Sequence, residues 1–236
     1  MLVSIKALGR WALLGTALLV NAQNVPLRIM PLGASITHGV GTDSGNGYRQ
    51  YLLEHLNGAG FEVDYVGSQS SGTMEDKDNE GYPGKRIEQI TETIQGTLPG
   101  LPGPNVYTIN AGTNDGIQDF DVNNAGVRMY NMLDYLWTVT PDATVVLSTL
   151  IRHLDPDTDA RVGNINEQYR GLVWDLANLQ GKRIVLAEMH GDDGPQDGDI
   201  NDDQIHPNEE GFRKMAAVWH RSILQANDAG LILPAP

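Results

Sequence analysis

The sequence predicts an α/β fold in which a parallel sheet of five strands carries helices on both faces. Two observations lead to this prediction. Short runs rich in apolar and β-branched residues alternate about five times with segments of helical periodicity, and neither an internal repeat nor a linker interrupts the alternation. Because parallel strands need crossover connections, and helices supply them, this order of elements is typical of a sheet between two helix layers.

Five apolar runs bounded by Gly, Pro or Asn are the predicted strands. In chain order they are Val25–Leu32, Glu62–Gly67, Asn105–Asn110, Ala143–Leu150 and Arg183–Glu188. Five segments with one apolar face are the predicted helices. They are Gly47–Asn57, Ile87–Leu98, Val122–Thr138, Val162–Leu179 and Glu209–Gln225. Pro207 and Asn208 give the last helix a clear start signal.

The first 22 residues have the pattern of a signal peptide. Lys6 and Arg10 precede an apolar run from Trp11 to Val20, and small residues up to Ala22 follow it. The run is shorter than the roughly 18 apolar residues that indicate a membrane span, although an uncleaved anchor remains an alternative. We therefore expect cleavage near Ala22, an extracellular location, and a single catalytic domain over residues 23–236.

The composition excludes several classes of function. The chain has no cysteine, which rules out thiol nucleophiles, thiolate metal sites and disulfides. Its formal net charge of -14 disfavours nucleic acid and anionic membranes as partners, because both require a basic face. A neutral polymer or a small molecule fits this charge better.

Polar residues with chemical uses follow the predicted strands, where ligands of open α/β sheets bind. Ser35 comes just after the first strand, in Gly-Ala-Ser-Ile-Thr, which lacks the second glycine of the α/β-hydrolase nucleophile motif. Asp203 and His206 are three residues apart before the last helix, so one turn lets the carboxylate reach the imidazole. A serine, a base and a group that orients the base are what acyl transfer requires.

Two further residues suit the stabilisation of an oxyanion. Asn114 follows the third strand and offers two amide N–H donors, although Asn in such a loop also serves simply to cap a turn. Gly84 precedes a helix, where a glycine brings backbone N–H groups close to an anion. Glycine before a helix is also ordinary, so neither residue decides the function alone.

Metal binding is the rival chemistry for the acidic segment before His206. Oxygen-bearing side chains alternate there as in the start of a calcium loop, at Asp197, Asp199, Asn201 and Asp203. However, Asp202 stands where an EF-hand has glycine, and Asn208 where it has glutamate. The prediction is therefore no resident metal and no cofactor, with a structural calcium ion as the alternative.

Four blocks of the sequence, in order, resemble those of the SGNH (GDSL-type) hydrolases. They are Gly33-Ala34-Ser35-Ile36-Thr37, Glu80-Gly81-Tyr82-Pro83-Gly84, Ala111-Gly112-Thr113-Asn114-Asp115 and Asp203-x-x-His206-Pro207-Asn208. Longer stretches such as RIMPLGASIT, VGSQSSGTM and HPNEEGFRKMA resemble secreted fungal members of carbohydrate esterase family 3, which remove acetyl groups from xylan. The resemblance covers nearly all of residues 25–236.

This resemblance implies a flavodoxin-like three-layer α/β/α fold and a serine esterase that acts on acetylated polysaccharide. It implies Ser35 as nucleophile, His206 as base and Asp203 as its partner. It also implies an oxyanion hole formed by the Ser35 N–H, the Gly84 N–H and the Asn114 amide, with Gly81 as the alternative to Gly84. Ala34 departs from the usual family signature, which has Asp before the serine.

Two matters stay open at the level of sequence. The acyl donor could instead be another acetylated glycan, a lipid or a thioester, and a carbohydrate-binding relative without catalysis is the alternative outside enzymes. For substrate binding, Tyr82 is the preferred residue because it lies between the two glycines of the second block.

Overall fold

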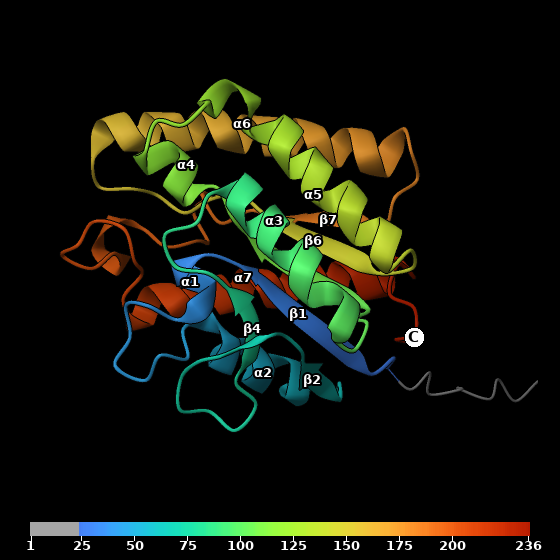
Figure 1. Ribbon diagram of the computed structural model, residues 1–236. Coiled ribbons are helices and arrows are strands. Elements are labelled where there is room, and N and C mark those ends of the chain that lie inside the picture. The colour runs from blue at the N-terminus through green and yellow to red at the C-terminus, as the bar shows by residue number, and fades with distance from the viewer. Residues whose placement is uncertain (1–23) are drawn as a thin grey trace, which may run out of the picture.

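A computed structural model describes residues 24–236, and the expected signal peptide and the start of the mature chain lie outside these residues. One sheet runs through the molecule, with helices above and below it (Figure 1). Its strands are β1 (Leu27–Gly33), β2 (Val63–Tyr65), β3 (Gln69–Ser70), β4 (Asp78–Gly81), β5 (Val106–Asn110), β6 (Thr144–Ser148) and β7 (Ile184–Ala187). The predicted α/β class with a mostly parallel sheet is therefore confirmed.

Strand β1 lies at the centre of the sheet. The strand order is β3-β4-β1-β5-β6-β7, and β2 also pairs with β1. All pairings are parallel except that of β3 with β4. Strands β2 and β4 share one side of β1, since β2 pairs with its first half at Leu27 and β4 pairs with its end at Leu32 and Gly33.

The sheet has seven strands rather than the predicted five, because β3 and β4 were not predicted. Strand β4 carries polar residues, and both Asn79 and Glu80 are fully buried. The Glu80 carboxylate accepts hydrogen bonds from the Ser68 N–H and from the Tyr82 hydroxyl. Buried polar groups are tolerated when they are hydrogen-bonded, so this strand has no apolar pattern that would reveal it in the sequence.

The helices form two layers. Their bounds are α1 (Ser35–His38), α2 (Tyr48–Gly58), α3 (Ile87–Thr97), α4 (Thr113–Ile117), α5 (Ala125–Val139), α6 (Pro156–Asn178) and α7 (Glu209–Asp228), with 3-10 turns η1 (Leu98–Gly100), η2 (Val122–Asn124) and η3 (Asp197–Asp199). Helices α3, α5 and α6 cover one face of the sheet, and α2 and α7 cover the other. Helix α6 starts six residues earlier than predicted, because Asp155 accepts a hydrogen bond from the Thr158 N–H and Pro156 suits the first turn.

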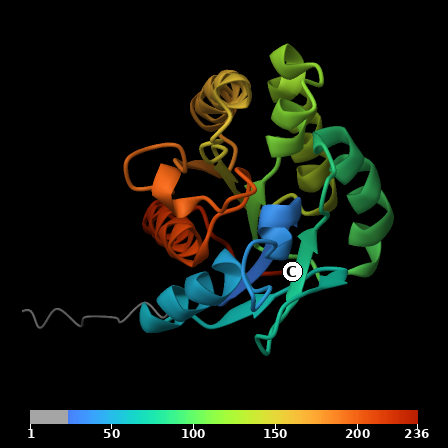
Figure 2. The same cartoon turned by 90° about the vertical axis from the view of Figure 1, so that its left-hand side faces the viewer.

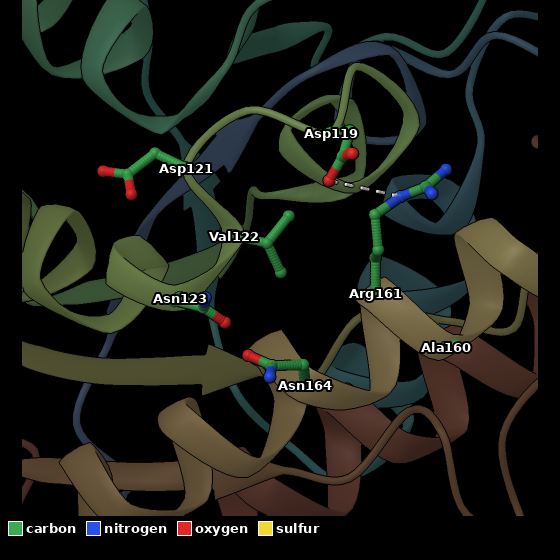
Figure 3. Close-up of a pocket in the computed structure, with 7 residues that line it drawn as sticks. All are labelled: Asp119, Asp121, Val122, Asn123, Ala160, Arg161 and Asn164. Atoms are coloured by element: carbon green, nitrogen blue, oxygen red, sulfur yellow. Dashed lines mark ion pairs between the residues drawn. The ribbon is translucent and has the colours of Figure 1, made fainter.

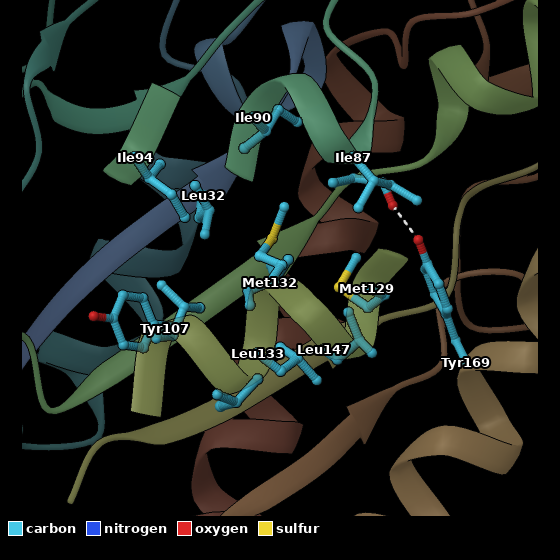
Figure 4. Packing of buried hydrophobic residues seen from close by; sticks show 14 of the residues in the cluster. Leu32, Ile87, Ile90, Ile94, Tyr107, Met129, Met132, Leu133, Leu147 and Tyr169 are labelled. Carbon is cyan, nitrogen blue, oxygen red and sulfur yellow. Dashed lines mark hydrogen bonds between the residues drawn. The ribbon is translucent and has the colours of Figure 1, made fainter. Parts of the chain in front are cut away.

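Each layer buries its own apolar cluster against the sheet. Figure 4 shows the cluster under α3 and α5, where Ile90, Met132 and Leu133 meet strand residues such as Leu32 and Leu147. On the other face α7 packs on α2, with the rings of Tyr48 and Trp219 5.7 Å apart. Within residues 24–236, no helix has the length and apolar character needed to cross a membrane.

Candidate active site

The nucleophile candidate Ser35 lies where the central strand meets its first helix. Strand β1 ends at Gly33, and Ser35 begins α1 two residues later. A Cβ on Gly33 would overlap the Asn110 carbonyl oxygen and the Thr37 hydroxyl, so only glycine lets the chain turn here. As the first residue of α1, Ser35 has an N–H without an intrahelical acceptor. Both its hydroxyl and its N–H are therefore available at this edge.

Ser35, His206 and Asp203 form one continuous series of hydrogen bonds. The Ser35 Oγ atom lies 2.8 Å from Nε2 of His206, and Nδ1 of His206 lies 2.6 Å from Oδ2 of Asp203. An ionised carboxylate only accepts hydrogen bonds, so the proton of the neutral ring sits on Nδ1. Atom Nε2 then accepts from the Ser35 hydroxyl, which is the arrangement that a general base requires.

The protein holds Asp203 in its ionised form. Partial burial raises the pKa of this carboxyl, but hydrogen bonds outweigh that effect and leave the pKa below its usual value. The Oδ1 atom accepts the N–H groups of His206, at 2.9 Å, and of Ile205, at 3.0 Å, and the imidazole adds the contact to Oδ2. The carboxylate is therefore charged and oriented at neutral pH.

The loop that carries His206 is tied to the loop that follows α1. The Asn201 amide donates to the carbonyl oxygens of Gly41 and Pro207, at 3.0 Å each. A Cβ on Gly41 would come within 2.7 Å of the Pro207 oxygen and 2.9 Å of the His206 Cβ, so the two loops touch directly. Figure 2 looks onto this edge, with the short blue helix α1 beside the orange segment that precedes α7. From the sequence, Asn201 was predicted only as a candidate calcium ligand.

The acidic segment is arranged to bind protein groups rather than a cation. Asp199 lies 2.6 Å from the Lys214 ammonium group and also accepts the Gln196 N–H. Asp203 serves His206, and the Asn201 amide donates its hydrogens to backbone oxygens. Among residues 24–236, no group of three or more His, Cys, Asp or Glu side chains is arranged to hold a metal ion. The structure thus gives no support to the calcium alternative.

The strand register brings the other candidate donors to the same place. Gly33 at the end of β1 pairs with Gly81 of β4 on one side and with Asn110 of β5 on the other. Three carboxyl ends of parallel strands therefore stand side by side. The segments that leave them carry Ser35, Gly84 and Asn114.

Gly84 suits the role of backbone donor better than Gly81 does. The Gly81 N–H already donates to the Asn79 side-chain oxygen at 2.9 Å. Gly84 adopts a φ of 79°, a left-handed conformation that favours glycine, with open space around its Cβ position. The Tyr82 N–H donates to the Gly33 carbonyl oxygen at 2.9 Å, which holds this segment against the end of β1.

Asn114 is fixed in orientation and keeps one donor spare. Its Nδ2 donates to the Lys85 carbonyl oxygen at 3.0 Å, next to Gly84 in sequence. Since an amide nitrogen has two N–H donors, the second has no partner among the described residues. The following residue, Asp115, is fully buried and accepts hydrogen bonds from the Ile87 N–H and from Arg128. Burial raises the pKa of the Asp115 carboxyl despite the opposing effect of Arg128.

Tyr82 does not fit the substrate-binding role expected from its position in the sequence. Its side chain is 8% exposed and belongs to the core on the α3 side. Its hydroxyl contacts Glu80 and lies 3.1 Å from Ser68 Oγ. Burial, followed by Glu80, raises the pKa of this hydroxyl, which therefore acts as a hydrogen-bond donor inside the protein. A buried ring cannot serve as an open platform for a sugar.

Comparisons with known proteins identify relatives of this chain. Residues 32–214 match the model of the GDSL-like Lipase/Acylhydrolase family. A family 3 carbohydrate esterase from Clostridium thermocellum superposes with a TM-score of 0.76 at 30% identity, over 87% of this chain and 99% of that chain. A family 3 carbohydrate esterase from Talaromyces cellulolyticus shares the fold with a TM-score of 0.71 at 23% identity, over 86% and 99% of the two chains.

Two curated relatives match this chain over only part of their own length. A multidomain esterase of Ruminococcus flavefaciens is 28% identical over 248 residues, which cover 92% of this chain and 31% of that protein. A putative endoglucanase X of Acetivibrio thermocellus is 29% identical over 135 residues, which cover 57% of this chain and 56% of that protein. The chain thus spans about a third and about half of the lengths of these relatives.

Proposed function

Because the chain belongs to the GDSL-like lipase/acylhydrolase family, we propose that it is a secreted serine esterase that removes O-acetyl groups from acetylated xylan. The chain is a carboxylic ester hydrolase similar to family 3 carbohydrate esterases. Its export and its acetylated substrate are the parts that we propose. One observation carries the mechanism. It is the hydrogen-bonded series in which Asp203 orients His206, whose Nε2 lies 2.8 Å from the Ser35 Oγ.

The reaction begins when the Ser35 oxygen attacks the carbonyl carbon of an acetyl ester. His206 takes the hydroxyl proton at Nε2, and the Asp203 carboxylate stabilises the resulting imidazolium ion. When the tetrahedral intermediate collapses, His206 gives that proton to the departing sugar oxygen. Water then attacks the acetyl-enzyme with His206 again as base, which releases acetate and restores Ser35.

Three N–H groups are the donors for the negative oxygen of the intermediate. They are the backbone N–H of Ser35, the backbone N–H of Gly84 and the free amide hydrogen of Asn114. The residues that carry these groups follow the ends of β1, β4 and β5, which pair in register. The donors are therefore positioned before the substrate binds. Donors that need no reorganisation are the most effective in stabilising such a charge.

Three features favour an acetylated polysaccharide as the substrate. The family 3 carbohydrate esterase of Clostridium thermocellum is 30% identical over nearly its whole chain. In addition, Ser35 and His206 are both partly exposed rather than enclosed, and the formal net charge of -14 suits a neutral polymer better than an anionic one. A different acyl donor, such as a lipid or a thioester, is the rival within the same chemistry.

We propose that residues 1–22 direct export of the protein. The pattern of residues 1–22, with Lys6 and Arg10 before an apolar run, supports cleavage near Ala22. Amino-terminal sequencing of protein recovered from the medium of an exporting host tests this part. A mature chain that starts near residue 23 is the expected result, and recovery only with membranes would contradict it.

The decisive experiment measures acetate release from acetylated xylan and from a small chromogenic acetate. The wild type should act on both, and Ser35→Ala should act on neither. Ser222→Ala is the matched control, because this serine lies in helix α7 and its hydroxyl bonds to the helix backbone. Activity on the small ester alone would move the search to another acyl donor. Activity that survives Ser35→Ala would refute the assigned nucleophile.

A further inference from the structure

A polar cavity lies next to helix α4, which carries Asn114. It has a volume of about 410 Å³ and opens between the segment that follows α4 and the first turns of α6 (Figure 3). Most of the side chains around it are polar. The lining residues are Asp119, Asp121, Val122, Asn123, Ala160, Arg161 and Asn164.

The cavity borders helix α4, which also carries the proposed donor Asn114. Helix α4 carries Asn114 in its first turn and leads directly to Asp119. The helix ends at Ile117, and Asp119 lies five positions after Asn114 in the chain. Arg161 of the cavity donates from Nε to the Gly116 carbonyl oxygen at 2.6 Å, which fixes α6 against α4. The cavity therefore lies next to the helix that supplies the proposed Asn114 donor.

Several groups that line the cavity have hydrogen-bonding capacity left over. Within residues 24–236, the Asn123 side chain makes no hydrogen bond, and Asn164 uses its oxygen but not its amide nitrogen. The Asp119 carboxylate is 73% exposed, and its nearest cation is Arg161 at 4.0 Å (Figure 3). Arg161 uses Nε and one of its two terminal nitrogens. The cavity is therefore lined by hydrogen-bond donors and acceptors that can bind a ligand or water.

The backbone at the rim is held in an uncommon conformation. Asp119 and Asp121 have φ values of 49° and 42°, and Gln204, next to Asp203, has a φ of 68°. These three are the non-glycine residues with positive φ in the described part of the chain, and two of them line the cavity. Aspartate adopts this conformation more readily than most residues, so the two values mark tight turns that shape the rim.

We propose that this cavity is a second glycan subsite, which binds an unmodified sugar unit of the polymer whose acetyl group is presented to Ser35. A sugar hydroxyl both donates and accepts, so it matches a wall of mixed amide, carboxylate and guanidinium groups. Two carboxylates disfavour an anionic ligand, and the Asp121 carboxylate is already held by Arg128 and Asn124. The Ala160 side chain offers a small apolar contact. The inference rests on the proposed function.

Two variants test the subsite without touching the proposed catalytic groups. Ala160→Trp fills the cavity from an exposed position of α6, and Asn123→Ala removes an amide that has no partner in the described chain. We expect KM for acetylated xylan to rise about fivefold in Asn123→Ala, the effect of one lost hydrogen bond, and at least as much in Ala160→Trp. The kcat/KM for a small chromogenic acetate should stay within about twofold, since that ester does not reach the cavity.

The matched control is Trp174→Ala, on the same helix. Trp174 is 58% exposed and does not line the cavity, so its loss should alter neither substrate's kinetics. A direct measurement uses Ser35→Ala and unacetylated xylohexaose, titrated by calorimetry. Adding Ala160→Trp to Ser35→Ala should weaken xylohexaose binding by the same factor as the rise in KM.

The outcomes separate the two proposals. If the wild type releases acetate from xylan and both variants keep its KM for xylan, the subsite is refuted while the esterase assignment stands. If Ser35-dependent release from xylan is absent altogether, the proposed substrate is refuted, and the subsite that rests on it is refuted as well. Circular dichroism checks that Ala160→Trp is folded. Asn123→Ala keeps the test decisive if Ala160→Trp is not.

Discussion

Gly33 of β1 lies directly opposite Asn110 of β5, and the two backbones approach so closely that a Cβ on Gly33 would overlap the Asn110 carbonyl oxygen. Ser35 follows Gly33 by two residues, and Asn114 follows Asn110 by four. This single close approach therefore sets the spacing between the proposed nucleophile and one of the donors for its oxyanion.

Gly33→Ala should lower both stability and activity. Forcing a methyl group into this contact displaces β1 from β5, and overpacking of this kind costs about 1–3 kcal/mol. Urea unfolding and acetate release measure the two effects. Gly58→Ala is the control, because Gly58 is in α2 and an added Cβ would meet nothing within 4 Å. It should be neutral or slightly stabilising, and an equal loss in both variants would contradict the argument.

Asp203→Asn should reduce kcat by about 10⁴-fold, as loss of the orienting carboxylate does in comparable triads. An asparagine side chain presents either an amide oxygen or an N–H to Nδ1 of His206 and carries no charge to stabilise the imidazolium. Asp202→Asn, one residue earlier in sequence, should retain full activity. Comparable activity of the two variants would remove Asp203 from the mechanism.

Asn114→Ala should lower kcat by about 10²–10³-fold, because one of the three oxyanion donors is lost. The KM for the small acetate should change little, since the interaction forms in the transition state. Asn178→Ala, at the exposed end of α6, provides the control. A rise in KM with unchanged kcat would instead indicate that Asn114 binds the ground state of the substrate.

Acid should destabilise the protein partly through Asp199. Burial raises the pKa of this carboxyl, but hydrogen bonds from Lys214 and from the Gln196 N–H outweigh it and hold the pKa below the usual value. A carboxyl with a lowered folded-state pKa stabilises the fold above its unfolded pKa, and this contribution disappears as the pH falls through the folded value. Urea unfolding at pH 7 and at successively lower pH measures it.

In Asp199→Asn, the free energy of unfolding should be lower at pH 7 and should fall less steeply with acid. Asp197→Asn is the matched control, since Asp197 lies two residues away and is exposed. Identical pH dependence in wild type and Asp199→Asn would show that the contact with Lys214 contributes nothing to stability.

Sequence patterns predicted those parts of the fold that depend on apolar periodicity. The central strand and helices such as α2 and α3 appear within one or two residues of their predicted limits. Strand β4 could not be predicted, because its buried Asn79 and Glu80 are stabilised by hydrogen bonds with partners that only the fold brings near. A polar segment of this kind reads as a loop.

Sequence patterns likewise predicted some features of the candidate site and not others. The juxtaposition of Ser35 with His206 was expected, because both belong to segments at the carboxyl edge of the sheet. The direction of a side chain was not predictable, and Tyr82 turns into the core instead of toward substrate. The link between Asn201 and the Gly41 carbonyl oxygen joins loops 160 residues apart, and no local pattern reports such a contact.

Ser35 and His206 are separated by 171 positions, with the serine after the first strand and the histidine before the last helix. The catalytic site is therefore complete only when both segments are present and folded together. A nascent polypeptide that ends before His206 contains Ser35 but no base for it, so it cannot hydrolyse esters by this mechanism. Recovery of activity during refolding should therefore be no faster than the docking of α7 onto α2.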